Sequence, residues 1–108
     1  MRLILIAMSI FTSMLFAQTH WETAVYAEDV WSYYVGISAP PDNWNELTFD
    51  TSSWEDGQGG FGYADGDDNT VIPNTLSVYF RKSFNITNVD EILSMAIHGD
   101  YDDGFVAY

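Results

Sequence analysis

Cysteine is absent from this sequence of 108 residues. Without thiols, the chain cannot form a disulfide, a thiolate metal site or a cysteine nucleophile. A domain of this size that lacks cross-links must depend on its hydrophobic core for stability. Aromatic residues make up 17% of the chain, which is enough to build such a core and argues against intrinsic disorder.

Basic residues are also scarce, with three lysines and arginines against 16 aspartates and glutamates. Nucleic-acid backbones are bound by clusters of basic side chains, and Arg81 with Lys82 is the only adjacent basic pair. We therefore expect no nucleic-acid partner, and the acidic charge also disfavours anionic membrane surfaces. Such a surplus of carboxylates suits either solubility alone or the binding of divalent cations.

The usual catalytic patterns are missing as well. The chain has two histidines and neither a Gly-x-Ser-x-Gly nor a His-Glu-x-x-His motif. We expect His98, beside Asp100, to be a surface residue rather than a catalytic one. With 16 carboxylates, some pair will stand at the spacing of a glycoside hydrolase in any fold, so that pattern is not specific. The sequence predicts no enzymatic activity for this chain and no catalytic residue.

Residues 1–17 have the features of a cleavable signal peptide. Arg2 gives a positive start, residues 3–16 are apolar apart from small polar residues, and Ala17 precedes the expected cleavage point. A membrane anchor needs roughly 20 apolar residues, more than this run offers. We expect a helical leader, export to the cell surface or the medium, and no membrane insertion after cleavage. The mature chain would have 91 residues and a net charge of −14.

The mature part is expected to be all-β. Residues 18–29 form a linker or a first strand, and residues 30–35 have the composition of a strand. Residues 76–84 give the strongest strand signal, with Leu76, Val78 and Phe80 on one face. Residues 92–98 alternate again, and a further strand begins at residues 105–108. Because the chain stops inside that strand, without a turn or a polar tail, we expect an N-terminal fragment of a longer protein.

Four segments in order carry a resemblance to a known family: residues 49–54 (FDTSSW), 59–67 (GGFGYADGD), 78–84 (VYFRKSF) and 101–108 (YDDGFVAY). This set is similar to a galactose-binding-domain-like jelly-roll module found near the start of large secreted bacterial proteins. The resemblance covers residues 30–108. It implies an antiparallel β-sandwich that is incomplete at its C-terminus, and downstream domains of the same parent chain as partners.

The sharpest candidate for binding chemistry is the glycine-bent stretch at residues 65–69. Asp65, Asp67 and Asn69 place oxygen side chains at alternate positions, and such oxygens can converge on Ca²⁺. A plain surface turn is the alternative, since Thr70 and Leu76 replace the glycine and the bidentate glutamate of a helix-loop-helix calcium motif. Asp102 and Asp103 either complete this site or pair with Arg81.

Exposed aromatic rings are the second candidate, because a flat π face can stack on a sugar ring. Trp44, Trp54 and Tyr63 lie in segments that we expect to be loops, and they are the candidate carbohydrate-binding residues. The alternative is that Trp54 and Tyr63 anchor the core of an aromatic-rich domain.

Three functions are compatible with these observations. The first is a non-catalytic accessory module of a secreted or cell-surface protein that binds carbohydrate weakly or acts as a spacer. The second is a calcium-stabilised structural or adhesion module without a sugar site. The third is the leading segment of an enzyme whose catalytic domain lies downstream.

Overall fold

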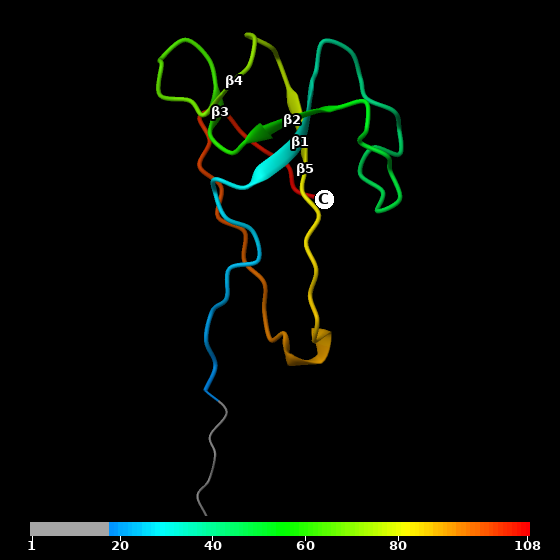
Figure 1. Ribbon diagram of the computed structural model, residues 1–108, viewed down its shortest axis with the longest axis vertical. Coiled ribbons are helices and arrows are strands. Elements are labelled where there is room, and N and C mark those ends of the chain that lie inside the picture. Colours follow the sequence, from blue (N-terminus) through cyan, green and yellow to red (C-terminus); the bar gives the residue numbers. More distant parts are fainter. Residues whose placement is uncertain (1–17) are drawn as a thin grey trace, which may run out of the picture.

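A computed structural model describes residues 18–108, and its regular structure there is almost entirely β. Three strands form an antiparallel sheet in the order β2-β1-β5, with β1 at Val30–Val35, β2 at Glu55–Gln58 and β5 at Val78–Arg81 (Figure 1). One short 3-10 helix, η1, follows at Val89–Glu91. The predicted all-β, antiparallel character is confirmed for this part of the chain. The predicted signal peptide lies outside the described residues.

The central strand, β1, has the bounds that the sequence predicts, because its β-branched and aromatic residues suit a ladder on both sides. Tyr33 stands opposite Glu55 of β2 and Phe80 of β5, and Tyr34 stands opposite Tyr79. Successive side chains of a strand point to opposite faces. This register therefore gives each face of the sheet its own set of aromatic rings.

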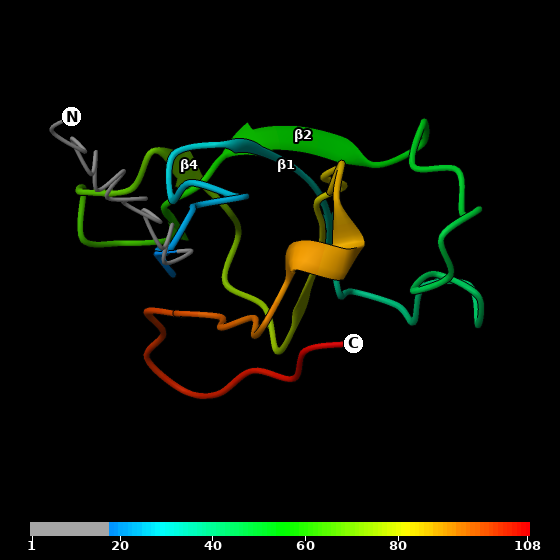
Figure 2. The same cartoon turned by 90° about the horizontal axis from the view of Figure 1, so that it is seen from below.

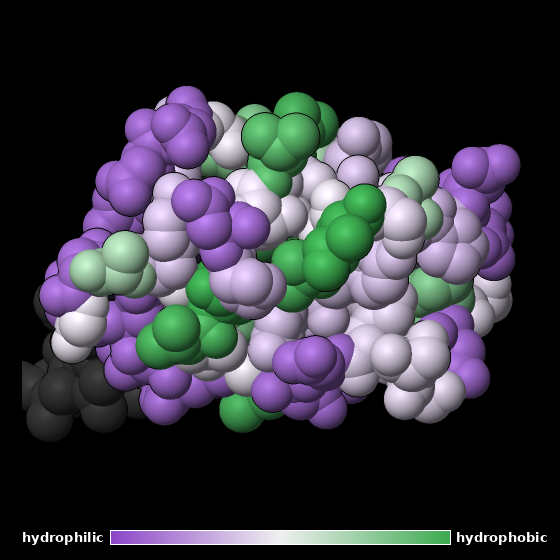
Figure 3. Space-filling view, turned by 90° about the horizontal axis from the view of Figure 1, so that it is seen from above, coloured by the Kyte–Doolittle hydropathy of each residue, from purple (hydrophilic) through white to green (hydrophobic). Residues whose placement is uncertain are grey.

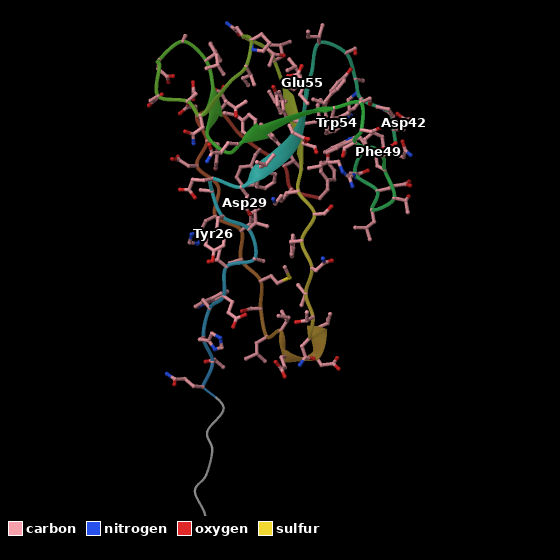
Figure 4. The ribbon with its side chains drawn as sticks, viewed as in Figure 1. Tyr26, Asp29, Asp42, Phe49, Trp54 and Glu55 are labelled. Carbon is pink, nitrogen blue, oxygen red and sulfur yellow. The ribbon has the colours of Figure 1, made fainter. Side chains whose placement is uncertain are left out.

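The first face carries a connected group of rings that we call the tryptophan cluster. Trp54 lies 5.5 Å from Tyr34 and 5.5 Å from Phe49, measured between ring centroids, and Trp44 stacks on Trp54 at 6.4 Å. Figure 4 shows Phe49 and Trp54 together beside the sheet. The cluster also includes Tyr79 and Tyr108. The turns between β1 and β2 thus cover this face of the sheet.

The opposite face is covered by a second, two-stranded element. In it, β3 at Phe61–Gly62 pairs with β4 at Thr70–Val71 in parallel. The Phe61 ring lies 5.1 Å from Tyr33 and 4.7 Å from Phe80, between centroids. Ile72, directly after β4, is buried with Tyr33 and Trp54. These three residues are the buried core of the described part, which is small for its length.

Two predicted strands do not form in residues 18–108. Residues 92–98 and 105–108 form no strand, and Leu93, Met95 and Ile97 are all exposed. Their alternating pattern favours a strand only when a neighbouring strand supplies a ladder, and no ladder to these residues is present. In Figure 2 the C-terminal segment lies across the molecule from β2.

The strongest strand signal is correct in place but not in length. β5 spans four residues rather than the predicted 76–84, and Leu76, expected on the inward face, is fully exposed. The register explains the shorter strand, because β1 pairs with β5 only from Ser32 to Val35. A space-filling view shows hydrophobic side chains at the surface among hydrophilic ones (Figure 3).

Within residues 18–108, no helix has both the length and the apolar character needed to cross a membrane.

Candidate functional site

The best-formed candidate site is a loop closed at its base by β3 and β4. The Thr70 amide donates to the Gly60 carbonyl at 3.0 Å, and the Ile72 amide donates to the Gly62 carbonyl at 2.9 Å. Residues 63–69, here called the acidic loop, leave and return to this base beside β3 and β4 (Figure 1). A compact loop with close ends can fix its side chains relative to one another.

Two left-handed residues shape the acidic loop. Ala64 has a φ of 77° and Gly66 a φ of 83°, so the chain turns sharply on both sides of Asp65. Left-handed backbone suits glycine but costs energy at alanine, where Cβ crowds the neighbouring carbonyl. The result is that the carboxylates of Asp65, Asp67 and Asp68 come within 4.8 Å of one another.

Asp68 is the innermost of the three. Its Oδ2 is removed from solvent and has no hydrogen-bond partner. Its carboxylate packs directly on the backbone of Gly62, where an added Cβ would stand 2.1 Å from Asp68 Oδ1. The glycine in β3 therefore makes the space that this carboxylate occupies. A carboxylate oxygen withdrawn from water without a partner is costly unless a proton or a cation satisfies it.

The electrostatics follow from this crowding. The pKa of Asp68 is raised, first by its desolvation and then by Asp65, Asp67 and Asp102. The pKa of Asp65 is lowered, chiefly by a hydrogen bond with the Asp67 side chain. When carboxylates share a site, one is pushed toward the protonated form while another keeps its charge. Asp68 is thus the group that takes up a proton as the pH falls.

The structure places the predicted metal ligands in different ways. Asp65 and Asp67 belong to the cluster, and Asp102 is near enough to act on the pKa of Asp68. The Asn69 side chain turns to the base of the loop instead, where Nδ2 donates to the Gly59 carbonyl at 2.7 Å. Asp103 is exposed and outside the cluster.

Asp68 is not among the predicted ligands. The prediction takes oxygen side chains at alternate positions, and Asp68 falls between two of these, Asp67 and Asn69. The sharp turn at Gly66 brings the consecutive Asp67 and Asp68 to one side. The signal that would have indicated Asp68 is the small residue at position 62, which leaves room for a side chain above β3. The predicted alternative, an ion pair of Arg81 with Asp102 or Asp103, does not occur, and Arg81 donates to the Trp44 carbonyl.

The three candidate carbohydrate-binding residues have different surroundings. Trp54 is 9% exposed and lies inside the tryptophan cluster, as the alternative interpretation of a core anchor expected. Trp44 is half-buried and packs against Trp54, Tyr79 and Tyr108. Tyr63, at the start of the acidic loop, is 48% exposed. The structure does not bring these three rings together as one platform.

Chemically, the acidic loop offers only oxygen ligands. Three carboxylates at close range suit a hard cation, and carbonyls and water supply the other positions in calcium sites. Comparisons of the chain with family models, with curated proteins and with solved structures find no significant match. The case for function therefore depends on the geometry of this site.

Proposed function

We propose that this chain is a calcium-stabilised, non-catalytic module of an exported protein, and that the acidic loop holds the ion. The observation that carries the proposal is the Asp68 carboxylate, whose Oδ2 is buried without a hydrogen-bond partner beside two further carboxylates. A divalent cation would satisfy that oxygen and cancel the repulsion within the cluster.

The choice of calcium rests on ligand type and setting. All three clustered ligands are carboxylates, which suit Ca²⁺, Mg²⁺ or Mn²⁺ better than metals that prefer nitrogen or sulfur. Mg²⁺ demands near-ideal octahedral geometry and keeps much of its water, whereas Ca²⁺ accepts irregular oxygen sets. An irregular loop with consecutive aspartates fits the second case. Extracellular modules bind Ca²⁺ with dissociation constants of about 10⁻⁴ to 10⁻³ M, which is the range we expect here.

The wider setting of the module is part of the same proposal. Residues 1–17 would direct export, and the antiparallel sheet β2-β1-β5 would be one layer of a galactose-binding-like sandwich. The aromatic rings on both faces of this sheet support that idea, because each face needs a covering layer. In a longer parent protein, such a module would act as a spacer or an adhesion unit next to downstream domains.

The test is a titration with terbium, a luminescent substitute for calcium. We expect excitation of the aromatic rings to produce terbium emission, because Tyr63 begins the acidic loop, and we expect Ca²⁺ to displace it. Asp65→Asn and Asp68→Asn should each weaken binding by at least about tenfold.

The matched control is Asp90→Asn, in the short helix η1 and outside the cluster. It removes the same charge from the molecule and should leave the titration unchanged. Equal weakening by all three variants would mean that terbium responds only to net charge, and the calcium proposal would then be wrong.

A further inference from the structure

The outer edge of β5 is free to pair with a further strand. β5 ends the sheet order β2-β1-β5, and in residues 18–108 no strand lies on its other side. The Gly36 amide donates to the Ser77 carbonyl at 2.8 Å, so Ser77 and Tyr79 direct their backbone groups toward β1. Because these directions alternate along a strand, the N–H and C=O groups of Val78 and Phe80 point outward. An edge of this kind is a template for another strand.

Residues 92–98 have the pattern of a strand but lack a partner. Leu93, Met95 and Ile97 alternate with smaller or more polar residues and are 64 to 80% exposed. The segment contains no aspartate, glutamate, lysine or arginine, although the chain as a whole is strongly acidic. A contiguous exposed apolar segment marks a site of interaction. Each copy of the chain therefore carries both an unpaired edge and an unpaired strand pattern.

One face of the β5 edge is apolar and only partly covered. Phe80 stays 39% exposed, although the Phe61 ring lies 4.7 Å from it between centroids. Leu76, two residues before β5, is fully exposed. Alternate residues of a strand share a face, so Val78 lies on this face as well. A strand that brings its own apolar residues beside them would extend the hydrophobic layer over the edge.

The two apolar patterns favour one antiparallel alignment. In it, three apolar pairs form together: Phe80 with Leu93, Val78 with Met95, and Leu76 with Ile97. A shift by one residue would turn the apolar side chains of residues 92–98 to the opposite face. The outward backbone groups of Val78 and Phe80 then meet those of Met95 and Leu93, as a ladder requires.

Charge distinguishes this alignment from shifts of two residues, because it also places Glu91 opposite Lys82. Glu91, the last residue of η1, is exposed and has no ion-pair partner in residues 18–108. Lys82 Nζ donates to the Val30 carbonyl at 3.0 Å and lies 3.7 Å from Asp29 Oδ2. An ammonium group has three donors, so a further acceptor can be bound. Sliding by two residues in either direction brings an apolar residue opposite Lys82 instead.

We propose that the chain forms a dimer in which residues 91–97 of each copy pair with the β5 edge of the other. Reciprocal exchange closes the pair as a two-fold dimer. Within one chain the C-terminal segment is held at the opposite face of the sheet, where Tyr108 lies 5.3 Å from Trp44 between ring centroids. The dimer satisfies free backbone groups and covers exposed apolar side chains. It does not depend on calcium in the acidic loop.

Cysteine cross-linking tests the alignment, because the chain has no cysteine of its own. In the proposed dimer Ser77 faces Ala96, with a Cα separation of about 4.5 Å that a disulfide can bridge. Ser94 lies diagonally from Ser77, at roughly 7 to 8 Å. With EDTA present, Ser77→Cys mixed with Ala96→Cys should form the mixed disulfide at least about tenfold faster than Ser77→Cys mixed with Ser94→Cys. Mass spectrometry of the oxidised mixtures measures this ratio.

Sedimentation equilibrium in EDTA tests the dimer itself. The wild type should change from one chain to two between about 10 µM and 1 mM. Met95→Pro removes an N–H that faces the partner edge and should abolish dimerisation. Ser94→Pro is the matched control, because the Ser94 N–H points away from that edge, and it should weaken dimerisation by no more than about threefold. Both positions are exposed and unpaired in the single chain, so neither variant should unfold it.

Four results would overturn the proposal. They are a wild type that stays monomeric at 1 mM, growth beyond two chains, equal loss of dimer in Met95→Pro and Ser94→Pro, and equal cross-linking of Ser77→Cys to Ala96→Cys and to Ser94→Cys. Equal loss in the two proline variants would mean that the chains associate through apolar contact without a ladder.

Discussion

Asp68 combines two properties that both work against its negative charge. Its carboxylate is packed against Gly62 and partly withdrawn from water, yet it faces three other carboxylates. Both effects disfavour its charged form. Either a proton or a cation would remove this unfavourable charge, so the proposed calcium binding would depend on pH through Asp68.

The pH dependence of stability provides a first prediction. The pKa of Asp68 in the folded chain lies above its ordinary value of 3.8, so the folded state binds this proton more tightly than the unfolded state does. Its contribution to the free energy of unfolding therefore rises as the pH falls through the raised pKa toward 3.8. In EDTA, Asp68→Asn should melt at a higher temperature than the wild type at pH 7, and this difference should shrink toward pH 4.

Thermal melts of both proteins between pH 7 and pH 4 measure this difference directly. Saturating Ca²⁺ should reverse the order at pH 7, because the variant loses a ligand. A constant difference across the pH range would contradict the raised pKa.

Gly62 provides a second prediction at the scale of the residue. An alanine there would place Cβ on the Asp68 carboxylate and push it out of its position above β3. Gly62→Ala should weaken Ca²⁺ binding by about tenfold or more, measured by calorimetry. Gly104→Ala is the control, because a Cβ at Gly104 meets no atom within 4 Å. Equal affinities for both variants would show that the carboxylate does not need this space.

At the scale of the element, the sequence predicts β1 well and the other strands less well. The composition of residues 30–35 agrees with the strand that forms, since each residue there is paired. β2 has the sequence Glu-Asp-Gly-Gln, which has poor strand propensity and gave no signal. It forms because β1 offers a free edge and Trp54, directly before it, is fixed in the core. Residues 92–98 show the converse, because a good pattern without a partner strand stays unpaired.

The acidic loop was predictable in composition but not in detail. Glycines and aspartates indicated a surface turn with clustered oxygens, and Asp65 and Asp67 do come together. The identity of the third carboxylate depends on backbone angles at Ala64 and Gly66, and these are set by the closure of β3 on β4. Such tertiary closure is not encoded in the local spacing of residues.

The prediction at the scale of the element concerns the contribution of the tryptophan cluster to stability. With so few buried residues, removing Trp54 should empty much of one face of the sheet. Trp54→Ala should lower the free energy of unfolding by about 3 to 5 kcal/mol, enough to unfold a small domain. Trp21→Ala is the matched control, since Trp21 is 74% exposed. Urea denaturation followed by circular dichroism would compare the two, and similar midpoints would contradict the cluster as the core.

At the scale of the whole molecule, the net charge and the size of the core both limit the stability of the fold. The described chain combines a large negative charge with a core of three buried apolar residues, Tyr33, Trp54 and Ile72. Self-repulsion destabilises a compact state, and a small core leaves little stability to oppose it. Binding of a divalent cation to the acidic loop would stabilise the fold by reducing the repulsion between its carboxylates.

The most direct test of this account is a thermal melt of the purified chain in EDTA and in Ca²⁺. At a free Ca²⁺ concentration ten times the dissociation constant, binding to the folded state alone adds about 1.4 kcal/mol. For a domain of this size, that corresponds to a rise in melting temperature of about 6 to 11 °C. We predict a rise of this size with Ca²⁺, and smaller rises with equimolar Mg²⁺ and for Asp68→Asn in Ca²⁺. A wild-type melting temperature that is the same in EDTA and in Ca²⁺ would contradict the calcium-stabilised module.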